Sequence, residues 1–193
     1  MIENVDKKTQ ATAMAWSLMG TFSSQGISFV VSIFLARLLT PEDFGLVGMS
    51  LVFVNLLQMI VDAGFTTALI QRKENSQEVY DAVFSFNLLV AIVLMLIFWS
   101  AAPAIGRFYN EPLVESLVFW LSMTLPLSAL SLVQRGILER HLRFKDLGVR
   151  SVVAGVISGI FGVALALLGY GVYALVVQVL SASLVSALVL WYV

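Results

Sequence analysis

The sequence has no cysteine and a single histidine, His141, among its 193 residues. Without thiols the chain cannot form disulfides, thiolate metal sites or a cysteine nucleophile. A lone histidine beside arginines is typical of a solvated surface residue rather than a catalyst or a metal ligand. Phosphate-binding glycine loops and zinc-binding motifs find no match in the sequence either. We therefore predict a protein that is not an enzyme, with no catalytic residues, no metal and no cofactor.

Charged residues are scarce as well. Only 12% of the residues are charged, 60% are hydrophobic, and the mean hydropathy is +0.95. A soluble domain averages about 25% charged and about 45–50% apolar residues. Because so few charges cannot cover a water-facing surface, the sequence indicates an integral membrane protein, and no nucleic-acid partner is expected.

The apolar residues gather in five uncharged runs, at 9–36, 44–61, 82–106, 116–134 and 151–193. A helix needs about 20 apolar residues to cross about 30 Å of hydrocarbon. The first four runs each suit one span, and the fifth, with 43 residues, suits two. Two glycines at 169 and 171 are expected to allow the reversal between those last two spans.

The predicted fold is all-α: one six-helix transmembrane bundle that covers residues 1–193 as a single lobe. Its helices are expected at about 11–36, 44–61, 80–102, 113–133, 151–168 and 172–192. The first turn, RLLTPEDFG at 37–45, predicts a helix start with Thr40 as N-cap, Pro41 at the first helical position and acids next. Pro126 predicts a kink within the fourth helix.

Lysine and arginine are distributed unevenly over the two sides of this layout. Nine of the 11 lie on one side, in the N-terminal tail, the second-to-third connection and the segment 134–150, and only Arg37 and Arg107 lie on the other. The positive-inside rule then places both termini in the cytoplasm, in a multi-pass protein of the cytoplasmic (inner) membrane. The segment 134–150 mixes basic and apolar residues and is expected to form a helix at the interface.

Small hydroxyl residues recur along the first span at steps of three and four, with Gln25 beside them. They lie on one face of the helix: Ser17, Thr21, Ser24, Ser28 and Ser32. One interpretation is that these residues allow another helix to pack closely. The other is that this face lines a hydrated cavity.

The second span repeats the pattern with Asn55, Gln58 and Asp62, three and four residues apart. Amides and carboxylates are costly in hydrocarbon, so these side chains are expected to face protein or water. For Asp62, capping of a short following helix is the favoured interpretation. The candidate cavity residues are Ser17, Thr21, Ser24, Gln25, Asn55, Gln58 and Asp62.

The fifth span carries Gly155, Gly159 and Gly162 together with Ser151 and Ser158. Small residues at helical spacing let two helices approach closely within a bilayer. This pattern predicts a packing face for a neighbouring helix.

Four stretches resemble a known family: LARLLTPEDFGLVGM at 35–49, VDAGFTTALIQRK at 61–73, RFYNEPLVESL at 107–117 and LERHLRFKDLGVRS at 138–151. The chain is similar to the polysaccharide transporters of the multidrug, oligosaccharidyl-lipid and polysaccharide flippase superfamily. The likeness is nearest to the branch of lipopolysaccharide, colanic acid and teichuronic acid exporters.

This resemblance implies a flippase of two six-helix lobes that moves a lipid-linked oligosaccharide or polysaccharide precursor by alternating access. The chain would be the N-terminal lobe. Its partners would be the lipid-linked glycan, membrane lipids, and the C-terminal lobe of the same protein or a second copy. Arg135, Arg140 and Arg143 would be candidates for a diphosphate headgroup at the cytoplasmic entrance, although most of them are expected to serve topology instead.

Two alternatives stay open at this point. An ion-coupled small-molecule exporter of the related multidrug group often carries an acid in its first helix, and residues 9–36 contain none. A non-transporting membrane scaffold subunit would need no second lobe. The absence of an acid disfavours the first alternative, and the second remains.

Overall fold

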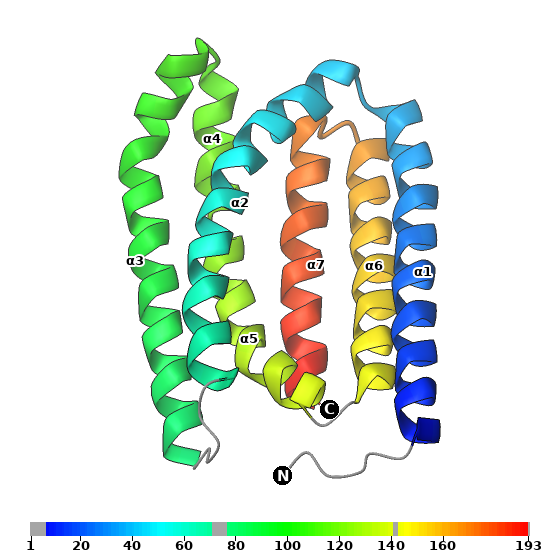
Figure 1. Ribbon diagram of the computed structural model, residues 1–193. Helices are drawn as coiled ribbons and strands as arrows, with labels where there is room; N and C mark the ends of the chain where they lie inside the picture. Colours follow the sequence, from blue (N-terminus) through cyan, green and yellow to red (C-terminus); the bar gives the residue numbers. More distant parts are fainter. Residues whose placement is uncertain (1–6, 71–76, 141–142, 193) are drawn as a thin grey trace.

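The structure is a computed structural model that describes residues 7–70, 77–140 and 143–192. Within these residues it contains seven helices and no strand (Figure 1). The helices are α1 (Lys7–Leu38), α2 (Pro41–Ile70), α3 (Gln77–Tyr109), α4 (Pro112–Leu121), α5 (Thr124–Arg140), α6 (Phe144–Leu167) and α7 (Val172–Tyr192).

Six segments of the described chain are long and apolar enough to cross a membrane, and α4 and α5 together make the fourth of them. The six spans alternate in direction, with α4 and α5 running the same way, so α1 begins and α7 ends at the same end of the bundle (Figure 1). We call this the lower end and the opposite one the upper end. The predicted all-α, six-span membrane bundle is confirmed.

The turn between α1 and α2 has the cap that its sequence predicts. The Thr40 backbone N–H and hydroxyl both donate to Oδ2 of Asp43, at 2.9 and 2.8 Å, and the Asp43 N–H donates back to the Thr40 hydroxyl at 3.3 Å. This reciprocal pair satisfies backbone donors that a helix start would otherwise leave unpaired. The helix α2 therefore begins at Pro41, which has no N–H to satisfy.

The fourth span breaks before Pro126 rather than at it. The helix α4 ends at Leu121 and α5 begins at Thr124, so Pro126 is the third residue of a new helix. Proline cannot donate to the carbonyl four residues earlier, here Ser122, and its ring collides with it. The N–H of Leu125 donates to that Ser122 carbonyl at 3.0 Å instead, which tightens the chain at the break.

The reversal between α6 and α7 uses the two glycines that the sequence singles out. Gly169 and Gly171 have positive φ angles of 81° and 54°. The N–H of Tyr170 donates to the Leu165 carbonyl at 3.1 Å, and that of Gly169 donates to the Ala166 carbonyl at 3.1 Å. This is the Schellman pattern, in which a glycine in the left-handed region ends a helix.

The segment 134–150 is not a separate interfacial helix. The helix α5 extends through Arg140 and α6 begins at Phe144, so the segment is divided between the ends of two spanning helices. One of its apolar residues, Leu138, is buried inside the bundle.

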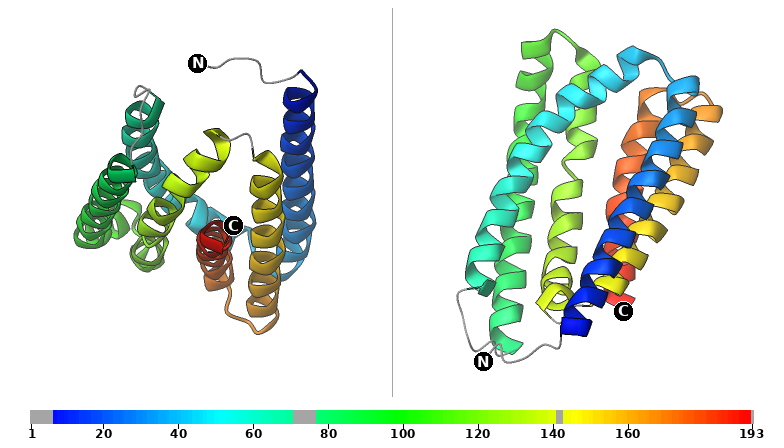
Figure 2. Two further views of the ribbon diagram at one scale, coloured as in Figure 1. Left: turned by 90° about the horizontal axis from the view of Figure 1, so that it is seen from below. Right: turned by 45° about the vertical axis from the view of Figure 1, so that its right-hand side comes forward.

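The helix α6 packs against α1 on one side and α7 on the other, and Figure 2 shows α1 and α6 running side by side. A Cβ atom at Gly20 of α1 would lie only 2.8 Å from the Cα of Gly148 in α6. Farther along, Gly155 faces Ile27 and Gly159 faces Val31. The small-residue packing face predicted for the fifth span is confirmed for Gly155 and Gly159, whereas Gly162 faces Gln178 of α7.

The larger hydrophobic core lies at the upper end, where the end of α1, the start of α2, α4 and the start of α7 meet. Its members include Leu35, Leu46, Val118, Leu121 and Val176. A smaller cluster surrounds Leu125 and Ala129 of α5. Dense apolar packing thus holds the upper end together, and the candidate site lies at the other end.

Candidate functional site

A cleft of about 180 Å³ lies between α1, α5 and α6. Its lining residues come from the beginning of the spans Trp16–Leu38 and Phe144–Leu167 and from the end of the span Pro112–Glu139. All three are lower ends of spans (Figure 1). The cleft therefore lies between the lower ends of three spanning segments.

The wall formed by α1 consists of Ser17, Gly20, Thr21 and Ser24. Steps of three and four residues place these small residues on one helix face. The Thr21 hydroxyl donates to the Ser17 carbonyl at 2.9 Å, and the Ser24 hydroxyl donates to the Thr21 carbonyl at 2.9 Å. Their hydroxyl oxygens therefore remain as acceptors at the wall, while their hydrogens bond the backbone of their own helix.

The wall formed by α5 is charged. Arg135 and Glu139 are one helical turn apart, and the Nε atom of Arg135 donates to Oε1 of Glu139 at 2.8 Å. Their side chains are 54% and 45% exposed, so the pair contributes little to stability, as is usual for exposed pairs at this spacing. Its importance lies in placing one cation and one anion at the mouth of the cleft.

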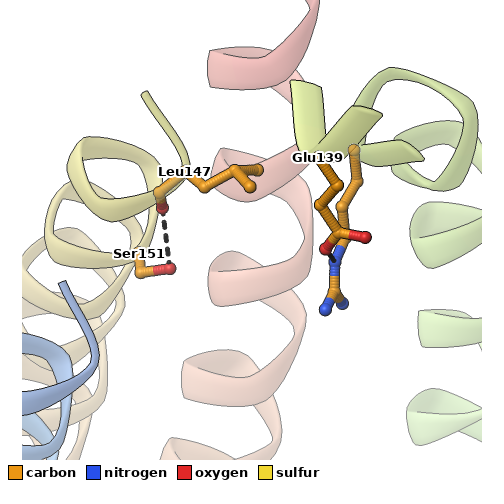
Figure 3. Close-up of polar contacts among 4 residues, drawn as sticks. Glu139, Leu147 and Ser151 are labelled. Carbon is orange, nitrogen blue, oxygen red and sulfur yellow. Dashed lines mark hydrogen bonds and ion pairs between the residues drawn. The ribbon is translucent and has the colours of Figure 1, made fainter. Parts of the chain in front are cut away.

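The wall formed by α6 includes Leu147, Gly148, Arg150 and Ser151. Figure 3 shows the Ser151 hydroxyl donating to the Leu147 carbonyl, at 3.0 Å, and the Leu147 side chain directed towards Glu139. Arg150 is half-buried, and its Nε atom is buried without a hydrogen-bond partner among the described residues. The backbone of Gly148 closes the floor against Gly20.

The charges of the cleft do not balance. Arg135 and Arg150 are two cations, and Glu139 is the one anion that lines the same cleft. Because Glu139 is already bonded to Arg135, its charge compensates Arg150 only in part. A further negative group would stabilise a partly buried cation in this position.

The structure brings together four of the residues that the sequence proposed for function. Ser17, Thr21 and Ser24 of the first helix line the cleft, and Arg135 lies on the facing wall. The hydroxyl face of α1 and a basic residue of the segment 134–150 thus belong to one site.

The amides proposed for function lie elsewhere. Gln25 of α1 and Asn55 of α2 are exposed and do not line the cleft. Gln58 accepts a hydrogen bond from the Ser128 hydroxyl of α5 at 2.9 Å. One of these amides therefore joins two helices, and the other two face outward.

The remaining candidates are not part of the cleft as described. Arg143 is bonded to Asp146, with its Nε atom 2.6 Å from Oδ2, and it does not line the cleft. Asp62 lies within α2, which continues to Ile70, so it does not cap a short following helix as predicted. The side chains of Asp62 and Arg140, and the whole of His141, lie outside the described residues.

Sequence reasoning missed Arg150 and Glu139 as site residues. Arg150 counted only as one of many basic residues near a membrane surface, and Glu139 was not considered. The spacing of Arg135 and Glu139 on one helix face could have indicated the pair. The position of Arg150 opposite that pair depends on how α5 and α6 meet, which no local pattern contains.

Fold and site together define a multi-pass helical membrane protein with a polar cleft at one end of its bundle. Its helices cross the membrane six times within the described residues. The chain belongs to the polysaccharide biosynthesis protein family, whose family model matches residues 34–193.

Three relatives illustrate the family. The chain is 31% identical over 185 residues to the succinoglycan biosynthesis transport protein ExoT of Rhizobium meliloti, covering 96% of this chain and 37% of the relative. It is 29% identical over 143 residues to the lipopolysaccharide biosynthesis protein WzxC of Escherichia coli, covering 72% and 29%. It is 25% identical over 143 residues to the teichuronic acid biosynthesis protein TuaB of Bacillus subtilis, covering 74% and 30%.

The chain thus spans about a third of the length of the curated relatives it matches. No solved structure matches it significantly.

Proposed function

We propose that the chain forms one six-helix lobe of a flippase for a lipid-linked oligosaccharide or polysaccharide precursor. The observation that carries this proposal is the family match over residues 34–193. The Rhizobium relative is named as a succinoglycan biosynthesis transport protein. Transport of a glycan precursor is therefore the activity that the relatives support best.

In this proposal a second lobe completes the transport path. It is either a further part of the same protein or a second copy of this chain, and each relative is long enough to contain more than one such lobe. Two bundles rocking around a shared site would give alternating access. The exposed amides of Gln25 and Asn55 would supply polar surface on α1 and α2 for the side that faces the path.

The lower end, which holds the cleft, is the cytoplasmic end in this proposal. Basic residues gather there at Arg135, Arg143, Lys145 and Arg150. The last turns of α1 and α3, at the upper end, have only Arg37 and Arg107. The positive-inside rule then places the start of α1 and the end of α7 in the cytoplasm, in the cytoplasmic membrane.

The chemistry of such a lobe is non-covalent. Hydroxyl oxygens and guanidinium groups bind a polar headgroup and release it, and no covalent bond of the substrate changes. Lipid tails stay in the bilayer, because transferring them into a polar path would cost about 0.8 kcal/mol per CH₂ group.

A chimera provides the test. The segment of the succinoglycan transport protein that matches this chain is replaced by the chain itself, and the chimera is expressed in Rhizobium meliloti lacking that protein. We expect secreted succinoglycan to return with the chimera and to remain absent with the chain alone. Immunoblotting of membranes checks that both proteins insert in equal amounts.

A chimera that inserts normally but secretes no succinoglycan, together with no rescue in strains lacking other polysaccharide flippases, would count against a transport function. Rescue by the chain alone, with crosslinking that shows a homodimer, would identify a second copy as the other lobe.

A further inference from the structure

Arg150 lines the cleft and has a hydrogen-bond donor without a partner among the described residues. A guanidinium has five N–H donors and no acceptor. The Nε atom of Arg150 is buried without a hydrogen-bond partner among the described residues, although the cleft that it lines is polar. A buried donor on a charged group is costly unless an acceptor meets it, so this arrangement favours an anionic ligand.

The acidic neighbour of Arg150 already has a basic partner. Glu139, its acidic neighbour, accepts a hydrogen bond from Arg135 at 2.8 Å. The carbonyl of Leu147, one turn before Ser151 on the same wall, accepts the Ser151 hydroxyl at 3.0 Å. Two arginines therefore face a single carboxylate, and the cleft keeps a net positive charge.

Residues typical of a membrane interface lie beside the cleft. Next to Ser17, the ring of Trp16 lies under the ammonium group of Lys145, with Nζ 5.6 Å from the ring centroid. Tryptophan and lysine are typical of the interface between hydrocarbon and water. This contact joins α1 to α6 beside the cleft and adds a third cation at its edge.

The volume suits a small polar group. At about 180 Å³ the cleft has room for several water molecules, each of which occupies about 30 Å³ in the liquid. A phosphate group fits within that space. Planar guanidinium groups bind phosphate through paired hydrogen bonds, which makes arginine the preferred residue for this ligand.

We propose that the cleft between α1, α5 and α6 binds the phosphate group of a membrane lipid, with Arg150 as its anchor. The lipid is either an anionic phospholipid or the carrier of the glycan, and the second choice rests on the proposed function. Arg135 lies at the mouth and can turn from Glu139 to the incoming phosphate, because that pair is exposed and weak.

Binding to the purified chain in a neutral detergent tests the proposal. The probes are dioctanoyl phosphatidylglycerol, farnesyl diphosphate, dioctanoyl phosphatidylcholine and inorganic phosphate, measured by microscale thermophoresis. We expect at least one of the two anionic lipids to bind, and Arg150→Gln to weaken that binding by about tenfold or more, as loss of a charge-assisted hydrogen bond implies. Dioctanoyl phosphatidylcholine should bind more weakly than either.

Arg107→Gln is the matched control, because Arg107 is exposed at the end of α3, where its Nε atom donates to the Pro103 carbonyl at 3.1 Å. It removes the same charge far from the cleft and should leave binding unchanged. If Arg150→Gln does not fold, Ser24→Leu provides a second variant, which fills the cleft without changing any charge and should also weaken binding.

The two anionic lipid probes distinguish the two possible sources of the phosphate group. Preference for farnesyl diphosphate over phosphatidylglycerol supports a glycan carrier, and the reverse supports a phospholipid. Equal binding by wild type, Arg150→Gln and Ser24→Leu, or equal binding of phosphatidylcholine, overturns the proposal. Succinoglycan secretion by the chimera is measured in a separate experiment. If the chimera restores secretion but the purified chain binds no phosphate-bearing lipid, only this inference is overturned.

Discussion

Replacing Gly20 with alanine should push α1 and α6 apart. A Cβ atom at Gly20 would lie 2.8 Å from the Cα of Gly148, whereas ordinary contacts begin at about 3.4 Å. The neighbour is backbone, so no side-chain rotation can relieve the contact, and the helices must separate by about 0.6 Å. Such overpacking costs about 1–3 kcal/mol.

Alanine also has an intrinsic advantage in a helix, of up to about 1 kcal/mol over glycine. The expected net effect of Gly20→Ala is therefore a loss of up to about 2 kcal/mol. Gly26→Ala is the matched control on the same helix, because a Cβ atom there meets nothing within 4 Å. That variant should be as stable as wild type or slightly more stable.

The assay is unfolding of the purified chain by SDS in mixed micelles, followed by far-ultraviolet circular dichroism. A third variant sharpens the result. In Gly159→Ala the new Cβ atom would collide with Cγ2 of Val31, which is a side-chain atom. Adding Val31→Ala should therefore recover part of the stability that Gly159→Ala loses. Val31→Ala should not rescue Gly20→Ala. Equal stability of Gly20→Ala and Gly26→Ala would refute the close approach of the two helix backbones.

Three further predictions concern other parts of the bundle. Ser128→Ala removes the hydrogen bond to Gln58 and should cost about 0.5–1.5 kcal/mol in the same SDS titration, with Ser100→Ala as an exposed control. Pro126→Ala should join α4 to α5 and slow amide hydrogen exchange at residues 122–126, and unchanged exchange would contradict the proline as the cause of the break. A cysteine at Asn110 should react with an impermeant thiol reagent from outside intact cells and one at Ser76 only after permeabilisation, and the reverse pattern would invert the topology.

The six apolar spans could be predicted because their causes are local. Hydrocarbon thickness sets the length of an apolar run. The cap at Thr40 and the reversal at Gly169 depend on a few adjacent residues. The break near Pro126 was predicted as a kink within one helix. It is a complete break because tight turns at Ser122 and Met123 replace the lost hydrogen bond.

The arrangement of the helices could not be predicted, because it depends on contacts between distant segments. Spacing showed which face of α1 is polar but not which helix that face meets. Neighbours in sequence are usually neighbours in space. Here α1 packs mainly against α6, while Gln58 of α2 meets Ser128 of α5. The cleft, and the role of Arg150 within it, follow from that pairing.

The pairing of α1 with α6 has a consequence for how the chain is made. The partner of α1 begins at Phe144, about a hundred residues later. At about 5–20 residues per second, the ribosome needs on the order of ten seconds to synthesise it. During that time the newly synthesised α1 must remain in lipid or beside an insertion factor, with its hydroxyl face not yet covered by α6. The bonds from Thr21 to Ser17 and from Ser24 to Thr21 lie within α1 itself, so they can form before any partner arrives. Hydroxyl groups that donate to carbonyls of their own helix lower the cost of holding a polar helix in the bilayer while the rest of the protein is still being translated.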